Sequence, residues 1–218
     1  MQILGNITLN ISLIIYLIWL LPQLLLNFKR KDTQGVSLLM HGILCIGYIS
    51  DLLYGFGREM QWQYRLITII GLCSLAIQHY QFWHYGMHRI TQKMTYSILN
   101  IIYLSLITYA VAALKAGYYS REFYDLIGML ANVCWLSYML PQIAKNFVNR
   151  STFGFSTHFI FLSIFLNLCD ATSAWTLEWD YPSKVGPIVT LIGNLILLCQ
   201  VQYYAKKEER LSQISQTC

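Results

Sequence analysis

Residues 19–37 read WLLPQLLLNFKRKDTQGVS, and residues 138–156 read YMLPQIAKNFVNRSTFGFS. The second stretch lies 119 residues after the first, and from Pro22 to Ser37 seven of 16 positions are identical: Pro, Gln, Asn, Phe, Thr, Gly and Ser. A match this dense at one fixed offset indicates an internal duplication. The fold is therefore expected to contain two copies of one structural unit.

The composition places this unit in a membrane. The chain is 56% hydrophobic and 11% charged, whereas a soluble domain carries roughly 25% charged residues. A spanning helix needs about 20 mostly apolar residues. Seven segments meet this requirement: 6–28, 36–56, 63–86, 94–114, 121–147, 153–176 and 184–205. The net charge of +5 therefore indicates orientation in the membrane, and no nucleic-acid partner is expected.

The predicted fold class is an all-α integral membrane protein with seven transmembrane helices, arranged as two parallel three-helix repeats joined by a linker helix. Three helices reverse the direction of the chain, so one extra crossing is needed before the second triplet can run parallel to the first. The expected units are 1–88 for the first repeat, 89–118 for the linker, 119–206 for the second repeat and 207–218 for a cytoplasmic tail. An outside N-terminus puts ten of the 15 basic residues on the cytoplasmic side, as the positive-inside rule favours.

The two motifs resemble the signature of the PQ-loop membrane proteins. Pro22-Gln23 and Pro141-Gln142 are each followed by Asn and then by Thr-x-Gly-x-Ser. That family includes cystinosin, lysosomal and vacuolar amino-acid exporters and, more distantly, the SWEET sugar transporters. The resemblance implies an alternating-access transporter of a small polar solute, an amino acid or amino-acid derivative first and a sugar second. A receptor or scaffold without transport is the alternative class, and no enzyme activity is expected.

Pro22 and Pro141 lie inside apolar segments, where proline removes a backbone donor and leaves the carbonyls of Ile18 and Ser137 without a helical partner. Gln23 and Gln142 are candidates to donate to these carbonyls or to a neighbouring helix. Two equivalent prolines favour a pair of hinges, and static kinks are the alternative.

A second duplicated pattern consists of charges near the predicted outer ends of the helices. Asp51 and Asp170 differ by 119 residues, as do Arg65 and Lys184. Because an ionisable group within a span is costly unless it is paired, the sequence predicts Asp51–Arg65 and Asp170–Lys184 ion pairs. They form either a structural clip or an outer gate.

Polar side chains on the third and seventh segments are expected to face a central cavity between the triplets. With three residues of slippage, Gln78 matches Gln200. Asn194 corresponds by resemblance to a substrate-contacting Asn of SWEET-like relatives and to a proton-coupling Asp of cystinosin-like relatives. Further candidates on other helices are Trp175, Asn167 and Asn132 for the solute. His79 is a candidate for proton coupling, and a hydrogen-bonded core histidine is the other interpretation.

The expected partners are a small polar solute, the lipid bilayer and, through His79, protons. No cofactor and no metal ion are expected, and the sequence leaves monomer and homo-oligomer open. The short loops favour a bacterial inner membrane, with a lysosomal or vacuolar membrane as the alternative.

Overall fold

The computed structural model describes residues 1–86, 90–117, 119–179 and 181–217, and the side chains within them except those of 90–93, 95, 181–183 and 206–217. These residues form the helices α1 (Gln2–Ile18), α2 (Leu21–Arg30), α3 (Leu38–Gly57), α4 (Trp62–Tyr85), α5 (Ile90–Ala116), α6 (Arg121–Ser137), α7 (Leu140–Asn149), α8 (Thr157–Thr176) and α9 (Tyr181–Thr217). The predicted boundary at 88/89 and residue 118 lie outside the described residues. The other unit boundaries stay predictions.

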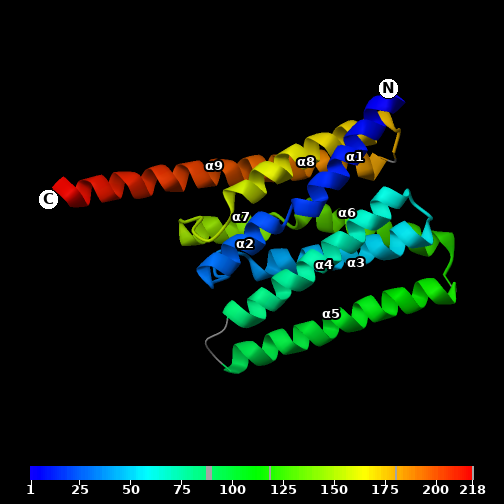
Figure 1. Cartoon of the computed structure of the whole chain (residues 1–218), viewed down its shortest axis with the longest axis horizontal. Coiled ribbons are helices and arrows are strands. Elements are labelled where there is room, and N and C mark those ends of the chain that lie inside the picture. The colour runs from blue at the N-terminus through cyan, green and yellow to red at the C-terminus, as the bar shows by residue number, and fades with distance from the viewer. Residues whose placement is uncertain (87–89, 118, 180, 218) are drawn as a thin grey trace.

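Seven helical segments are long and apolar enough to cross a membrane within the described part of the chain. They are Gln2–Arg30, Leu38–Gly57, Trp62–Tyr85, Tyr96–Ala116, Arg121–Asn149, Thr157–Thr176 and Lys184–Ala205. The predicted all-α fold class with seven spans is therefore confirmed, and the protein is a multi-pass integral membrane protein. Figure 1 shows these segments as one bundle, in which α5 lies along one edge beside α3 and α4.

The first and fifth spans are each broken into two helices at equivalent places. The first break separates α1 from α2 at Trp19–Leu20, and the second separates α6 from α7 at Tyr138–Met139. Pro22 and Pro141 then stand in the first turn of α2 and α7, where a helix has no partner for the backbone N–H and proline is tolerated. The interruption lies two or three residues before each proline, directly after Ile18 and Ser137, on the side where proline removes the helical hydrogen bond.

The duplication extends to backbone conformation. Left-handed residues occur at Lys31 and Arg150, and again at Glu59 and Glu178, each pair 119 residues apart. Ser37 and Ser156 begin α3 and α8, and their hydroxyls accept the backbone N–H of Met40 and Phe159 at 3.3 Å. Both serines are N-caps, as the motif Thr-x-Gly-x-Ser predicts for a turn into a helix.

The two repeats meet through crossed pairs of helices. The most extensive contacts between repeats are those of α1 with α8 and of α3 with α6. Each pair joins the first helix of one repeat to the second helix of the other, as a two-fold relation requires. At the end of the bundle where α2 and α7 lie (Figure 1), the two motif loops touch, because a Cβ on Gly35 would lie 2.2 Å from the carbonyl carbon of Gly154.

We expect Gly35→Ala to destabilise the protein. The added methyl group would overlap the Gly154 backbone, which has a φ of +83°, and overpacking of this kind costs about 1–3 kcal/mol. Gly42→Ala is the matched control, since a Cβ there meets nothing within 4 Å and alanine is favoured in a helix by about 1 kcal/mol. Thermal unfolding in detergent tests the pair. If both variants unfolded at the same midpoint temperature, the two motif loops would be shown to tolerate a larger distance between Gly35 and Gly154.

Candidate functional site

The motif end of the bundle is closed by two glutamines that reach across to the opposite repeat. Gln23 donates to the carbonyl of Gly154 at 3.0 Å and accepts the backbone N–H of Ser156 at 2.8 Å. Gln142 does the same in reverse, donating to the carbonyl of Gly35 at 2.9 Å and accepting the N–H of Ser37 at 2.7 Å. Both side chains are buried. We call these four cross-repeat hydrogen bonds the motif seal.

A second layer of amides supports the motif seal from within each repeat. Gln23 also donates to Asn27, which donates to Gln81, and Gln81 donates to the carbonyl of Leu24. In the second repeat the same chain runs through Gln142, Asn146, Gln200 and the carbonyl of Ile143. Gln200 is therefore the equivalent of Gln81 at the unbroken offset of 119, and the predicted match with Gln78 is wrong. Asn27 and Asn146 are buried members of this layer.

Lys145 and Arg30 hold the two motif loops together without a counterpart in the other repeat. The Lys145 ammonium donates to the backbone carbonyls of Gln34 and Val36, and the Arg30 guanidinium carbon lies 4.1 Å from the ring centroid of Phe153. The motif end therefore resists opening through backbone, amide and charged contacts at once.

Behind the motif seal lies a cavity of about 410 Å³ between the two repeats. Its lining comes from both triplets and includes Tyr48 and Asp51 on α3, Asn132 and Trp135 on α6, and Asn167 and Asp170 on α8. The cavity reaches the end of the bundle opposite the motifs, where Arg58, Met60 and Trp179 belong to the connections after α3 and α8. The arrangement can hold a small solute that enters from that end.

The two aspartates occupy equivalent walls of this cavity, and each accepts at least one hydrogen bond from the opposite repeat. Asp51 accepts the indole N–H of Trp135 at 2.8 Å and the hydroxyl of Tyr64. Asp170 accepts the hydroxyl of Tyr16 at 3.1 Å and that of Ser12. Trp135 and Tyr16 are themselves equivalent residues 119 apart. The carboxylates thus point between the repeats, toward α6 and α1.

The predicted Asp51–Arg65 and Asp170–Lys184 ion pairs are wrong. The Arg65 guanidinium carbon lies 5.5 Å from the ring centroid of Phe56, and the Lys184 ammonium lies 5.4 Å from that of Trp175. The ion pair found among the described residues is Arg58–Asp125 instead. Each aspartate faces the cavity and accepts a hydrogen bond from an aromatic side chain of the other repeat, whereas the two basic side chains contact aromatic rings near the C-terminal ends of α3 and α8.

Aromatic side chains form the deeper walls, and they were not predicted from the sequence. Tyr16 and Trp19 pack edge to face with centroids 5.9 Å apart, and their equivalents Trp135 and Tyr138 do so at 5.8 Å. Trp19 also donates to Ser163 at 2.6 Å. Positions 16 and 19 are aromatic, and so are the positions 119 residues later. This repetition is the sequence signal from which these walls could have been predicted.

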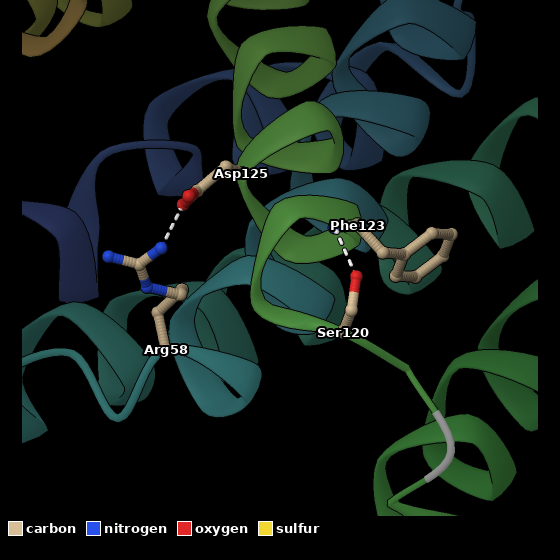
Figure 2. A network of polar contacts seen from close by, with 4 residues as sticks. All are labelled: Arg58, Ser120, Phe123 and Asp125. Carbon is tan, nitrogen blue, oxygen red and sulfur yellow. Dashed lines mark hydrogen bonds and ion pairs between the residues drawn. The ribbon is translucent and has the colours of Figure 1, made fainter.

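The mouth of the cavity carries an ion pair between the repeats. Figure 2 shows Arg58, at the C-terminal cap of α3, reaching Asp125 in the second turn of α6. In the same view Ser120 caps α6 by accepting the N–H of Phe123 at 3.4 Å, which fixes where the helix begins. The equivalents of Arg58 and Asp125 are Leu177 and Asn6, so only the α3–α6 side of the mouth is held by charge.

The structure places the predicted solute-binding residues in different surroundings. Asn132 and Asn167 line the cavity. Asn194 is fully buried and donates to the carbonyl of Thr190, with its own oxygen unpartnered, while Gln200 belongs to the layer under the motif seal. Trp175 is 57% exposed and is not part of the lining. A binding role for any of them stays a prediction.

His79 and Gln78 belong to a buried polar cluster inside the first repeat. His41 bonds to Gln78 at 3.0 Å and to His79 at 3.1 Å, and His79 stacks on Tyr103 of α5. The equivalents of the first three residues are Ile160, Leu197 and Leu198, so the second repeat is apolar at this place. Neither His79 nor Gln78 lines the cavity, and proton coupling through His79 stays a prediction.

Comparison with known proteins identifies the family of this chain. The model of the PQ loop repeat matches residues 4–64 and 123–183, two copies that again differ by 119. The chain belongs to the PQ-loop repeat family. The motif seal and the duplicated cavity walls are thus built from the two PQ-loop repeats.

Individual relatives agree with this assignment. The chain is 25% identical to a cystinosin homolog of Dictyostelium discoideum over 240 aligned positions, covering 94% of this chain and 82% of the relative. It is 33% identical to the vacuolar lysine transporter YPQ1 of Saccharomyces cerevisiae over 58 residues, which is 27% of this chain and 19% of that protein. The structure of a eukaryotic SWEET transporter matches with a TM-score of 0.68 at 15% identity, covering 93% of this chain and 99% of the other, and therefore shares the fold.

Double-mutant cycles test the revised partners of Asp51. Trp135→Phe removes the indole N–H that Asp51 accepts, so Asp51→Asn and Trp135→Phe should show a coupling of about 0.5–3 kcal/mol in unfolding free energy. The effects of Asp51→Asn and Arg65→Gln on the unfolding free energy should instead be additive within about 0.5 kcal/mol. Unfolding in detergent is the measurement. If only the Asp51/Arg65 cycle showed coupling, the Asp51–Arg65 ion pair would be supported after all.

Proposed function

We propose that this PQ-loop protein is a membrane transporter that moves a small polar solute through the central cavity by alternating access, and that the solute is an amino acid or amino-acid derivative. The observation that carries the proposal is one cavity between two equivalent repeats, reaching one end of the bundle and closed at the other by the motif seal. A site open to one side at a time is what alternating access requires.

The breaks in the first and fifth spans supply a means of opening the motif seal. Since α2 and α7 are separate helices that carry Gln23 and Gln142, each can tilt about the preceding break without unwinding the rest of its span. The four cross-repeat bonds contribute about 1 kcal/mol each, so breaking them costs about 4 kcal/mol, which a solute bound in the cavity can offset. The hinges are then the breaks at Trp19–Leu20 and Tyr138–Met139, and Pro22 and Pro141 stand in the first turn of each tilting unit.

The relatives support transport over catalysis. The yeast relative is named as a lysine transporter and the structural relative as a SWEET transporter. A sugar is the second candidate solute, favoured by the cavity amides Asn132 and Asn167 together with aromatic walls. A lysosomal or vacuolar location is favoured by the name of the yeast relative, and the bacterial inner membrane stays a prediction.

Uptake into proteoliposomes is the direct test. A panel of labelled amino acids and sugars should show saturable uptake of an amino acid, reduced at least about tenfold by Asn167→Ala, which removes an amide from the cavity wall. Asn149→Ala, at an exposed position at the end of α7, is the control and should match the wild type. Uptake of sugars only would show that the solute is a sugar and not an amino acid. The absence of uptake of any solute would favour the receptor or scaffold.

The motif seal has its own test, based on access to Ser163 in the cavity. In a background without native cysteines, Ser163→Cys should react with an impermeant thiol reagent from the cavity mouth and not from the motif side. Replacing both Gln23 and Gln142 by Leu removes the four bonds and should allow labelling from the motif side. Gln34→Leu is the control, because the side chain of this motif-end glutamine is exposed. Unchanged labelling in the double variant would show that other contacts close this end.

A further inference from the structure

Among the described residues, no basic side chain forms an ion pair with either of the two duplicated aspartates in the cavity lining. Arg58 is a basic residue in the cavity lining, and it is already paired with Asp125. Asp51 accepts hydrogen bonds from Tyr64 and Trp135, and Asp170 from Ser12 and Tyr16, all of them neutral donors. Within the described residues neither aspartate has a basic side chain at ion-pairing distance.

Such carboxylates are expensive within a membrane protein, where ionisable groups pair with one another or mark the path of a solute. Here the side chains that pair with them supply only part of what an ionised carboxylate accepts, because each oxygen has more than one lone pair. The remaining capacity faces the cavity. A positively charged group of a bound solute would complete both sites.

A tyrosine in the same cavity lining provides a second, independent indication. Tyr48 lines the cavity and is 1% exposed, yet its hydroxyl has no hydrogen-bond partner. Its ring packs edge to face on Trp135 with centroids 4.9 Å apart. A hydroxyl oxygen that can accept a hydrogen bond, next to aromatic rings, suits an ammonium group through hydrogen bonding and cation–π attraction.

The number of aspartates in the cavity indicates how many positive charges the solute carries. They are equivalent residues of two repeats related by a two-fold arrangement, and both line one cavity. Each repeat therefore contributes one carboxylate to the cavity, one for each end of a solute. The described lining offers no unpaired basic side chain for a carboxylate, because Arg58 is occupied by Asp125.

We infer that the cavity binds a solute with two positively charged groups on an aliphatic chain, an α,ω-diamine, with one ammonium at Asp51 and the other at Asp170. This inference rests on the proposed function, since it names the solute class of the same cavity. The Tyr48 hydroxyl accepts a hydrogen bond from one of the ammonium groups, and the aromatic walls cover the methylene chain. A carboxylate on the solute is not needed for binding.

Isothermal titration of the purified protein in detergent tests the inference with the wild-type chain alone. We expect 1,5-diaminopentane to bind at least about tenfold more tightly than 1-aminopentane, as the loss of one buried charge pair requires. Diamines of three to six carbons should show an optimum length. Lysine should bind no more tightly than 1,5-diaminopentane. A lysine affinity more than tenfold above that of the diamine would overturn the inference, because the carboxylate would then be recognised.

Charge-removing variants show whether the aspartates are the partners. Asp51→Asn and Asp170→Asn should each weaken 1,5-diaminopentane about tenfold or more, by similar factors, and bring its affinity close to that of 1-aminopentane. If the aspartates had only a structural role, the variants would weaken the binding of both amines in parallel. The ratio of the two affinities would then stay unchanged, which would contradict the inference. Glu122→Gln is the control, since Glu122 is an exposed carboxylate on α6 outside the lining.

Uptake measured on the same preparation separates this inference from the proposed function. Uptake of amino acids without binding of any diamine would overturn the diamine site and leave the transporter intact. Binding of diamines with the predicted length and charge dependence, but without uptake of any solute, would support the site and overturn transport.

Discussion

The amides of Gln23 and Gln142 are the contacts on which the rest of the structure depends. A backbone N–H or carbonyl that is cut off from water must find a partner inside the protein, and the motif loops at Gly35–Ser37 and Gly154–Ser156 have no strand or helix to provide one. Each glutamine supplies a donor and an acceptor to the loop of the other repeat. This exchange brings the two glycines into backbone contact. It also fixes the closed end of the cavity.

The parts that the sequence predicts well are those set by length, apolarity and repetition. Seven apolar segments and the offset of 119 residues lead to the architecture, because spans in lipid must be helices and a duplication must pack as two like units. The serine caps and the turns after Lys31 and Arg150 follow from the same repeated motif. These are local properties, and local sequence is sufficient for them.

The partners of the cavity residues could not be read in this way. The sequence pairs Asp51 with Arg65 through proximity along the chain, but helix packing brings Trp135, 84 residues away, to the carboxylate. The match of Gln78 with Gln200 failed for a similar reason. It required slippage in the outer loop, whereas the amide layer keeps Gln81 and Gln200 at the unbroken offset. Contacts between repeats depend on which face of a helix meets which neighbour, and periodicity alone leaves that open.

The crossed hydrogen bonds also affect the order in which the protein can be completed during synthesis. Gly35 and Ser37 obtain their partner only from Gln142, which lies 107 and 105 residues later in the chain. At translation rates of about 5–20 residues per second, this segment waits roughly 5–20 s for its amide. During that interval the first repeat is already long enough to have entered the membrane, with its motif loop still unsatisfied. The nascent first half is therefore an incomplete folding unit, and water or the insertion machinery must satisfy the loop at the membrane surface until the second half arrives.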